Sequence, residues 1–270
     1  MPPIRSMVLV AAPGAGLEAA LESPADAICL TLSDGRFPIS ELREAAAAAI
    51  PRIAAAGKRA LVKVNHPRTQ LLRADLEATV SSELFGVLLT QVAEPQDVRD
   101  LAVALREFEY ERGVEPGLVQ AFPVISSAPG LVRAVEVASA SPRRGGLIFD
   151  GAGYAEDVVG RDEESGPRFA YARGAVVGAS RAFNGTPLVF ADGIDMLPLA
   201  QSGFGGAVIR DSRLAGAANA AFTPTAAALD RARAHRETYA AARADAAWAG
   251  RFGDNLVDLH QNTTAAQLIE

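Results

Sequence analysis

The sequence predicts an α/β fold, a (β/α)8 barrel followed by a C-terminal helical extension. Eight short apolar runs alternate with stretches rich in Ala, Leu, Glu and Arg, and eight strand–helix pairs make up this fold. The runs are apolar almost throughout, as parallel strands buried on both faces must be. No G-x-G-x-x-G sequence opens a helix, which disfavours a doubly wound open sheet.

The apolar runs predict the eight strands in chain order. The first run is short and follows a single Arg, so it predicts a strand rather than a signal peptide. The predicted strands are Met7–Ala12, Ala27–Leu32, Ala60–Asn65, Gly86–Val92, Leu118–Ile125, Gly146–Asp150, Pro187–Asp192 and Gly206–Asp211.

The stretches between these strands predict helices, because they are dense in good helix formers. The predicted helices are Gly16–Leu21, Ile39–Ala56, Arg73–Ser81, Gln96–Arg112, Gly130–Ala138, Ala170–Ala182 and Met196–Ser202. The polar run Arg161–Pro167 predicts a loop.

The tail is longer than the eighth helix of a barrel requires. Thr223–Ala247 has a strong helical pattern, which Thr223 or Thr225 can cap and in which Pro224 suits the first turn. A Gly-rich turn follows within residues 248–258, and residues 263–270 predict a last short helix. We therefore expect a barrel over residues 1–222 and, over 223–270, a helix and tail that serve as a lid or an oligomerisation arm.

The composition excludes several classes of function. The net charge of −6 argues against a protein that binds nucleic acid or a membrane surface. Cys29 is the single cysteine and the three histidines lie far apart, so we expect neither a disulfide nor a zinc site. No apolar run reaches the roughly 18 residues that span a bilayer. These features predict a cytoplasmic protein whose partner is a small molecule.

Polar side chains at the ends of the predicted strands are the candidate site residues, because barrel enzymes place their reactive groups there. The predicted catalytic residues are Lys63, Asp150 and Tyr154. The predicted substrate-binding residues are Asp34, Asn65, Ser126, Ser127, Asp192, Arg210 and Asp211.

Lys63 is the most informative of these residues. In the sequence LVKVN, Leu61, Lys63 and Asn65 share one face of the strand. If that face points into the barrel, burial disfavours the charged amine and lowers its pKa. Such a lysine can form a Schiff base with a carbonyl substrate or bind a carboxylate. The alternative is an ion pair inside the barrel, for which the possible partners are Asp34, Asp150 and Asp192.

The other candidates also have a structural alternative. Aspartates that end separate strands can ligate a cation or act as an acid–base pair, and they can equally cap the next helix. Asp150 is preferred because adjacent glycines let a ligand approach the backbone. Ser126 and Ser127 can bind an anion or cap a helix, and no G-x-S-x-G motif marks a nucleophile. Tyr154 can donate a proton or pack its ring under a loop.

Several motifs match a known family in register. Residues 12–14 (APG) match its V-P-G, residues 62–65 (VKVN) match V-R-V-N, and residues 219–224 are the NAAFTP before its long C-terminal helix. In these motifs the chain resembles the HpcH/HpaI aldolase and citrate lyase β-subunit-like barrels. The resemblance implies a (β/α)8 lyase that uses Mg²⁺ and assembles into homo-trimers or hexamers.

The resemblance also places the two Mg²⁺ ligands of that family, a Glu and an Asp. They fall at Ser126 and at Gly153 or Tyr154, and none of these residues is a carboxylate, the ligand that hard cations need. Other motif positions also differ from the family, at Gly16, Ser33, Lys63, Thr90, Gln91, Ala93, Ala207 and Asp211. We therefore expect neither a metal nor another cofactor in this chain.

Together these observations predict a divergent lyase or aldolase that acts on a small carbonyl or acyl-thioester compound without Mg²⁺, in specialised metabolism. Two alternatives stay open. The chain can be a catalytically inactive barrel that serves as a binding or assembly partner. It can also be an ordinary Mg²⁺-dependent carbon–carbon lyase on a CoA thioester or oxo acid, with Asp150 as the substitute ligand.

Overall fold

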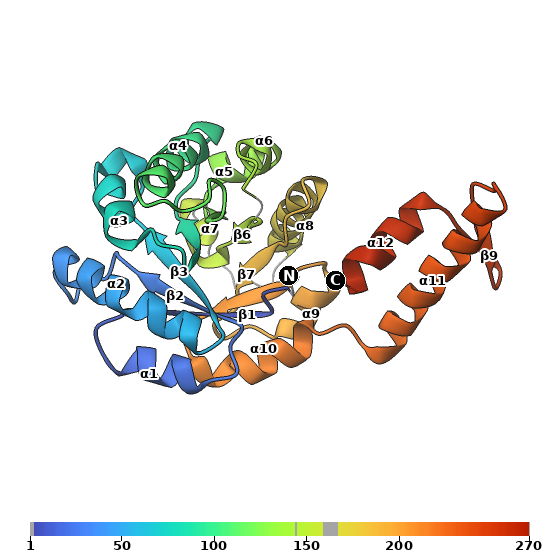
Figure 1. The fold of residues 1–270 in the computed structure, drawn as a ribbon, viewed down its shortest axis with the longest axis horizontal. Helices are drawn as coiled ribbons and strands as arrows, with labels where there is room; N and C mark the ends of the chain where they lie inside the picture. The colour runs from blue at the N-terminus through green and yellow to red at the C-terminus, as the bar shows by residue number, and fades with distance from the viewer. Residues whose placement is uncertain (1–2, 144, 159–166, 270) are drawn as a thin grey trace. The chain divides into compact units, whose positions relative to one another are not determined.

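In residues 4–222, eight parallel strands close into a barrel whose outside is covered by helices (Figure 1). This computed structural model describes residues 3–143, 145–158 and 167–269. The strands are β1 (Ser6–Val10), β2 (Ala27–Thr31), β3 (Arg59–Val64), β4 (Leu84–Leu89), β5 (Gln120–Ile125), β6 (Ile148–Phe149), β7 (Leu188–Phe190) and β8 (Gly206–Ile209). They pair in chain order, and β8 pairs with β1, so Met7 lies opposite both Ala27 and Val208. The predicted (β/α)8 fold is confirmed, and each strand overlaps one predicted run.

Helices fill the connections between the strands. They are α1 (Ala15–Glu22), α2 (Ile39–Ala55), α3 (Leu72–Thr79), α4 (Pro95–Glu111), α5 (Ala128–Val132), α6 (Ala134–Ser139), α7 (Gly151–Asp157), α8 (Pro167–Ala182), α9 (Met196–Gln201) and α10 (Ala215–Phe222). Two 3-10 turns, η1 (Pro67–Thr69) and η2 (Ser212–Leu214), follow β3 and β8.

Several helices of the barrel unit differ from the prediction. The predicted helix 130–138 is two helices, because Arg133 leaves the helical conformation at φ −100° and ψ 14° between α5 and α6. Two observed helices, α7 and α10, have no predicted counterpart. α7 begins Gly-Ala-Gly, a poor helix former, and forms where Asp150 accepts a hydrogen bond from the Gly153 amide at 3.1 Å. Residues 161–166 of the predicted loop lie outside the described residues, and Pro167 begins α8.

Alternate residues of each strand point to opposite sides of the barrel wall. One set fills the barrel interior with Ile4, Met7, Leu9, Ala27, Cys29, Leu61, Leu88, Phe122, Val124, Ile148, Leu188, Phe190 and Val208. The other set, which includes Val8, Ile28 and Val62, packs against the helices. Two residues beyond Leu61, Lys63 is therefore on the interior side, at the C-terminal end of the apolar filling.

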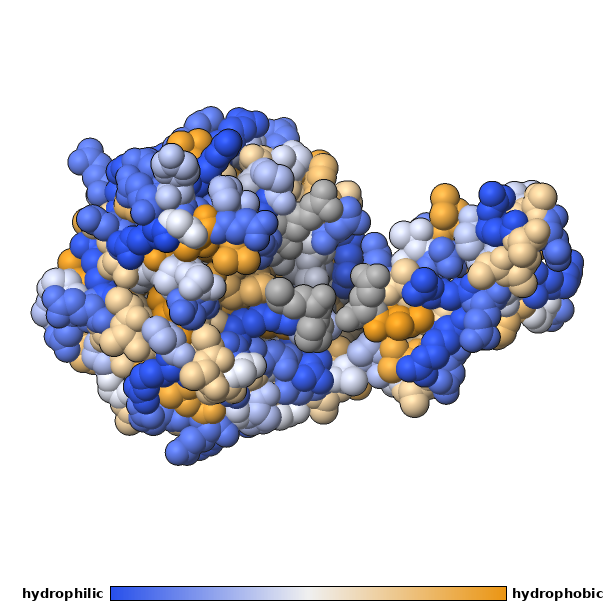
Figure 2. Space-filling view, viewed as in Figure 1, coloured by the Kyte–Doolittle hydropathy of each residue, from blue (hydrophilic) through white to orange (hydrophobic). Residues whose placement is uncertain are grey.

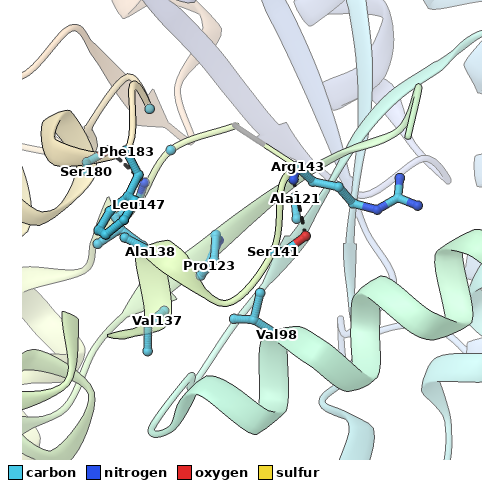
Figure 3. A pocket seen from close by; sticks show the side chains of 12 residues that line it. Val98, Ala121, Pro123, Val137, Ala138, Ser141, Arg143, Leu147, Ser180 and Phe183 are labelled. Atoms are coloured by element: carbon cyan, nitrogen blue, oxygen red, sulfur yellow. Dashed lines mark hydrogen bonds between the residues drawn. The ribbon is translucent and has the colours of Figure 1, made fainter. Parts of the chain in front are cut away.

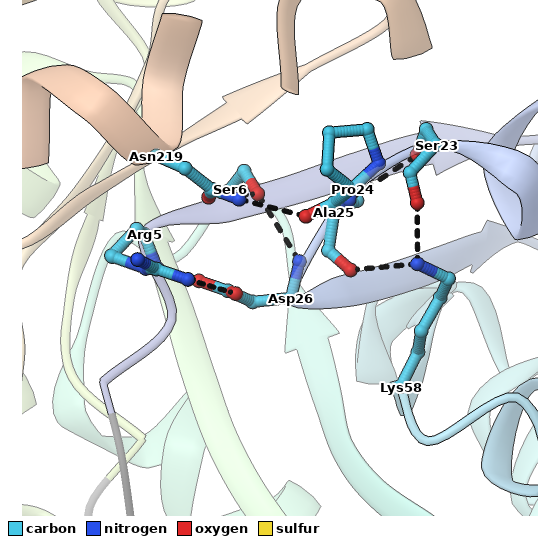
Figure 4. Close-up of polar contacts among 8 residues, drawn as sticks. All are labelled: Arg5, Ser6, Ser23, Pro24, Ala25, Asp26, Lys58 and Asn219. Carbon is cyan, nitrogen blue, oxygen red and sulfur yellow. Dashed lines mark hydrogen bonds and ion pairs between the residues drawn. The ribbon is translucent and has the colours of Figure 1, made fainter. Parts of the chain in front are cut away.

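A polar network ties the N-terminal ends of β1 and β2 to α10 (Figure 4). Ser6 Oγ donates to Asn219 Oδ1 at 2.7 Å and accepts from the Asp26 amide at 3.1 Å. Arg5 and Asp26 form an ion pair of 2.8 Å. Asn219, the first residue of the NAAFTP sequence, also donates to the Pro24 carbonyl at 2.7 Å. Asn219 therefore helps to close the N-terminal end of the barrel, which is opposite the end that carries the predicted site.

The second unit comprises residues 223–269 with Pro3. Helices α11 (Ala226–Ala244) and α12 (Leu259–Ile269) pack side by side, and β9 (Gly250–Phe252) pairs antiparallel with β10 (Asn255–Val257). The predicted Gly-rich turn is thus a small hairpin, which Gly253 allows by adopting a φ of +58°. α12 begins at Leu259 rather than at residue 263, because Asp258 Oδ1 accepts from the His260 amide at 2.7 Å and the Gln261 amide at 3.3 Å.

This second unit buries little. Its buried residues in the described range are Ala232, Ala242, Val257 and Ala265. Its exposed large apolar residues are Trp248, Leu256, Leu259 and Leu268. Figure 2 shows apolar patches among polar side chains on its visible face. None of the described helices has the length and apolar character that crossing a membrane requires.

Candidate functional site at the barrel mouth

The C-terminal ends of the strands form the mouth of the barrel. Lys63 lies in β3, and the other candidates follow a strand: Asp34 (β2), Asn65 (β3), Ser126 and Ser127 (β5), Asp150 and Tyr154 (β6), Asp192 (β7), and Arg210 and Asp211 (β8).

Lys63 is half-buried on the inner face of β3. Its register partners are Thr31 of β2 and Leu88 of β4. Its Nζ makes neither a hydrogen bond nor an ion pair with any residue that the structure describes. The ion pair that was the alternative for this lysine is therefore not formed within the described part of the chain.

The charges around Lys63 come from several strands. Burial lowers the pKa of the Lys63 amine below its ordinary value of 10.5; the Cys29 thiol opposes this, and Arg210 adds to it. Asp150 and Asp34 also oppose the shift, more weakly. The charged groups that act on the amine thus come from the ends of three other strands, β2, β6 and β8.

Asp150 lies beside Ser126 and Gly153. Asp150 Oδ1 accepts from the Gly153 amide at 3.1 Å, which leaves Oδ2 without a donor among the described residues. A Cβ placed on Gly153 would lie 3.0 Å from Ser126 Cβ and 3.1 Å from Asp150 Oδ2. The loops after β5 and β6 thus meet in tight contact at the mouth.

Asp34 is held by a neighbour in its own loop. Its Oδ2 pairs with Arg36 at 2.6 Å, and its Oδ1 accepts from the Arg36 amide at 3.0 Å. These hydrogen bonds lower the pKa of the Asp34 carboxyl to about 2. Asp34 is therefore a fixed negative charge at neutral pH.

Arg210 is positioned by two contacts. Asp192 Oδ2 pairs with its guanidinium at 2.5 Å, and Asp192 Oδ1 accepts from its amide at 2.7 Å. The guanidinium also lies over the Phe190 ring, 5.4 Å from its centre. Phe190 belongs to the apolar interior, so this stacking places the exposed guanidinium over the mouth end of the barrel filling.

The side chain of Asn65 is engaged away from the mouth. Its amide and its Nδ2 both donate to Asp75 Oδ2 at 2.8 Å. Asp75 is fully buried and pairs with Arg43 at 2.8 Å. In the structure, Asn65 therefore fastens β3 to α3.

Three further candidates make local structural contacts. Ser127 caps α5 by accepting from the Gly130 amide at 3.3 Å. Asp211 caps η2 and pairs with Arg213 at 2.7 Å. The Tyr154 ring packs against the rings of Phe149 and Phe169, with ring centres 5.8 and 6.1 Å away, on the helix side of the wall.

The structure thus gathers only part of the predicted set. Asp34, Asp150 and Arg210 each act electrostatically on Lys63, and Ser126 adjoins Asp150. Cys29, which also acts on the lysine amine, was not among the predicted site residues. The signal was present in the alternation of β2, which puts Cys29 on the interior face, two residues before the register partner of Lys63.

The residues present do not fit the family's two-carboxylate Mg²⁺ site. Ser126 and Gly153 bring no carboxylate, and one oxygen of Asp150 is occupied as a helix cap. Within the described ranges, no three His, Cys, Asp or Glu side chains are grouped so that they could hold a metal ion. The Asp157 carboxylate near the loop after β5 is engaged as well, because its Oδ2 accepts from the Ala128 amide at 2.7 Å. The residues at the two expected ligand positions thus supply none of the carboxylates that such ions ordinarily take.

A small cavity lies away from the mouth, on the helix side of the wall (Figure 3). Its volume is about 20 Å³, and its lining includes Val98, Ala121, Val137 and Leu147. This space suits one water molecule rather than a substrate.

The chain is similar to several known proteins. The model of the HpcH/HpaI aldolase/citrate lyase family matches residues 5–198. A citrate lyase from Burkholderia xenovorans LB400 has a TM-score of 0.78 at 16% identity, covering 100% of this chain and 91% of that one. CitE from Mycobacterium tuberculosis, in complex with magnesium, acetoacetate and coenzyme A, has a TM-score of 0.64 at 21% identity, covering 98% and 96%. RipC from Yersinia pestis has a TM-score of 0.65 at 19% identity, covering 83% and 97%. No curated protein sequence matches the chain.

The likeness to the solved structures is one of fold, since their sequence identities are low. The family model, in contrast, spans well over half of the chain, from the residue before β1 into α9. The resemblance in the motifs is confirmed: the chain belongs to the HpcH/HpaI aldolase/citrate lyase family.

Proposed function

We propose that this member of the family is a lyase or aldolase that acts on a small carbonyl or acyl-thioester compound and needs no Mg²⁺. The observation that carries the proposal is the group of charges around Lys63. An amine without a partner among the described residues lies on the inner face of β3 near the mouth, where barrel enzymes do their chemistry, and the charges of Asp150, Asp34 and Arg210 act on it. Membership of a family of aldolases and lyases supports the reaction class.

The substrate classes come from the similar structures. CitE of M. tuberculosis is in complex with acetoacetate and coenzyme A in one structure and with pyruvate in another. We extend the oxo acid and thioester classes to this chain. The two cations at the mouth support the extension, because both classes carry a carbonyl oxygen that gains negative charge during carbon–carbon cleavage or formation.

Each mouth residue has a role in this proposal. Lys63 and Arg210 attract the substrate's negative groups and stabilise the developing oxyanion. Asp150 Oδ2, which has no donor among the described residues, takes or returns a proton. Ser126 beside it offers a hydroxyl donor. Asp34 lends a permanent negative charge that limits the repulsion between the two cations.

Independence from Mg²⁺ rests on the residues at the two ligand positions. Ser126 and Gly153 offer one hydroxyl and no carboxylate, and the close contact between them leaves no space for a longer side chain on Gly153. In this proposal, Lys63 and Arg210 supply the positive charge that a metal would otherwise provide to the negatively charged substrate.

A thermal-shift titration tests the function. The EDTA-treated protein would be melted with pyruvate, acetoacetate or acetyl-CoA, each with and without added MgCl₂. A ligand at 100 times its Kd stabilises the native state by about 2.7 kcal/mol, so a shift of a few degrees is expected, equal in EDTA and in Mg²⁺. A shift that requires Mg²⁺ would instead identify an ordinary Mg²⁺-dependent lyase with Asp150 as a ligand. The absence of any shift contradicts the proposed substrate classes.

A catalytically inactive binding protein is the second candidate. It is favoured by the local ion pairs of the mouth aspartates, since Asp34, Asp192 and Asp211 each pair with an arginine within the protein. In that case a carbonyl compound would bind without being consumed over hours. Turnover that is lost in Lys63→Met would exclude it.

We also propose that the protein is a cytoplasmic homo-oligomer, a trimer or hexamer, that works in specialised metabolism. The exposed apolar residues of the second unit, Trp248, Leu256 and Leu259, support an interface.

A further inference from the structure

The chain contains only two lysines, Lys58 and Lys63, against 24 arginines, since Lys and Arg together number 26. An arginine cannot act as an amine nucleophile, because its guanidinium stays protonated. Any chemistry that needs a side-chain primary amine must therefore use one of these two residues.

The two lysines are five residues apart, and their environments differ. Lys58 immediately precedes β3, at the end of the barrel opposite the mouth. Its Nζ donates to the carbonyls of Ser23 at 2.6 Å and Ala25 at 3.0 Å, which fixes it as a tie between loops (Figure 4). Lys63 lies near the mouth end of the same strand, and its Nζ has no partner among the described residues.

The immediate surroundings of Lys63 suit an amine that reacts in its neutral form. The floor below it is apolar, with Cys29, Leu61 and Leu88 on the interior face. Arg210 is a second cation near the amine, and repulsion between the two favours loss of a proton from Lys63. No described carboxylate is close enough to form an ion pair that would hold the proton.

We propose that Lys63 is a covalent catalytic residue that forms an imine with the carbonyl carbon of an oxo acid substrate. The inference deepens the proposed function and rests on it. It names one substrate class, oxo acids and their β-hydroxy adducts, and one bond, from Lys63 Nζ to the substrate carbon.

The reaction needs neither a metal nor an oxidant. The neutral amine attacks the carbonyl carbon, the carbon–oxygen π electrons move to oxygen, and a proton passes from the nitrogen to that oxygen. The carbinolamine then takes up a proton from solvent on its hydroxyl and loses water to give a protonated imine. In a β-hydroxy substrate, the hydroxyl proton passes to Asp150 and the carbon–carbon bond breaks. Its electron pair moves to the imine nitrogen and leaves an enamine and a free aldehyde or ketone. Asp150 returns the proton to the enamine carbon, and water hydrolyses the imine and releases the amine.

In this proposal the neighbouring residues have complementary roles. Arg210 is held over Phe190 by Asp192 and can bind the carboxylate of an oxo acid while its carbonyl faces Lys63. Asp150 has a free oxygen for the proton. The negative charge of Asp34 stabilises the cationic imine once it forms.

Reductive trapping tests this proposal directly. The intact protein would be incubated at neutral pH with pyruvate or acetoacetate and sodium cyanoborohydride, then digested and examined by mass spectrometry. A trapped imine adds the mass of the oxo acid less one oxygen atom to one peptide. We expect the adduct on Lys63 to form at least about tenfold faster than on Lys58, because the carbonyls of Ser23 and Ala25 hold Lys58 Nζ as a protonated donor, whereas Lys63 Nζ has no such partner among the described residues.

Two matched variants complete the experiment. Lys63→Arg keeps the positive charge and removes the nucleophile, so the fast adduct and the turnover should both disappear. Lys58→Arg keeps donors for the two carbonyls and should trap at the rate of the unaltered protein. Melting curves show whether each variant is folded.

The outcomes of this experiment distinguish failure of the imine proposal from failure of the proposed lyase or aldolase function. Equal labelling of Lys58 and Lys63 by both oxo acids contradicts the proposal, as does turnover in a folded Lys63→Arg variant. If the oxo acids still bind and react in that variant, the proposed function stands and the imine is wrong. If they neither bind nor label Lys63, both are wrong.

Discussion

The half-buried Lys63 side chain lowers the stability of the folded protein, and its proposed catalytic role explains why it is present. Burying a polar group without a hydrogen bond costs roughly 1–3 kcal/mol in proteins, and Lys63 is half-buried with no partner among the described residues. By contrast, Lys58, Arg43 and Arg143 all have carbonyl or carboxylate partners. An uncompensated amine at a barrel mouth is typical of a residue kept for chemistry.

Lys63→Met should therefore stabilise the protein while it abolishes activity. We expect a gain of roughly 1 kcal/mol in the free energy of unfolding at neutral pH, measured by urea denaturation. The pKa of Lys63 is lower in the folded than in the unfolded chain, so its cost is fully present below the folded pKa. The cost fades as pH rises from there towards the unfolded value of 10.5, and the two curves should converge. A variant less stable than the unaltered protein at neutral pH would show that Lys63 has a stabilising partner.

Gly153 tests the contact between the loops after β5 and β6. In Gly153→Ala, the new methyl group would lie 3.0 Å from Ser126 Cβ, so one loop must move. We expect a loss of roughly 1 kcal/mol in the free energy of unfolding, which Ser126→Gly should largely relieve in the double variant. Additive effects in this double-mutant cycle would mean that the two residues do not touch. Gly178→Ala is the control, because its added Cβ meets no atom within 4 Å.

Among the elements of the barrel, the end of α4 is fastened to the residues before β5 and to the loop before β6 through the buried carboxylate of Glu109. Glu109 of α4 pairs with Arg143 at 2.6 Å and accepts from the amides of Gly117 at 2.9 Å and Val119 at 3.0 Å. Burial raises the pKa of the Glu109 carboxyl, but the hydrogen bonds from Arg143 and the two amides outweigh it and leave the pKa below the ordinary value of 4.5. The carboxylate therefore holds the start of β5 against the end of α4.

Glu109→Gln should cost roughly 3 kcal/mol, because it leaves Arg143 buried without its counter-charge. The contribution of Glu109 is present above pH 4.5 and is lost as pH falls through the lower folded pKa. The unaltered protein should thus lose stability in that acid range more steeply than the variant, in urea titrations at each pH. Parallel acid limbs would contradict the lowered pKa.

An element could be predicted where its own residues show a clear pattern, and could not where a single contact decides whether it forms. All eight strands could be predicted, because a strand buried on both faces must be an apolar run. Helix α7 could not, since its glycines disfavour a helix and a cap at Asp150 decides it. The two strands of the hairpin β9–β10 could not be predicted either, because a three-residue strand is too short to show an alternation of apolar and polar residues.

The same distinction applies to the candidate site. The inward position of Lys63 follows from the alternation within LVKVN, which is local. The capture of Asn65 by Asp75 depends on how α3 packs, and that packing is settled by the tertiary fold. The pairing of Asp192 with Arg210 joins residues 18 positions apart on neighbouring strands, so no local pattern announces it.

For the whole molecule, the two units differ in how much core they contain. Residues 4–222 enclose two extensive apolar clusters, one inside the barrel and one between strands and helices. Residues 223–269 bury three alanines and one valine and expose Trp248, Leu256 and Leu259. A unit with so small a core gains little from folding alone, which favours the proposal that it is covered in an oligomer.

Sedimentation velocity checks that proposal. We expect a trimer or hexamer at micromolar concentration, and a smaller species when Leu256→Asp and Leu259→Asp are combined, because charges are costly in an apolar interface. Val103→Asp is the control, since Val103 on α4 is equally exposed in the barrel unit. A monomer in the unaltered protein would contradict the oligomer.

The barrel mouth is proposed to bind a small carbonyl compound through Lys63 without Mg²⁺. Calorimetric titration of acetoacetate into the EDTA-treated protein, and into the Lys63→Met variant, measures this binding. We expect acetoacetate to bind in EDTA, added Mg²⁺ to give no gain, and the variant to bind at least about tenfold more weakly, because it lacks a charge-assisted contact. Binding that appears only with Mg²⁺, or that is unchanged in Lys63→Met, would contradict it.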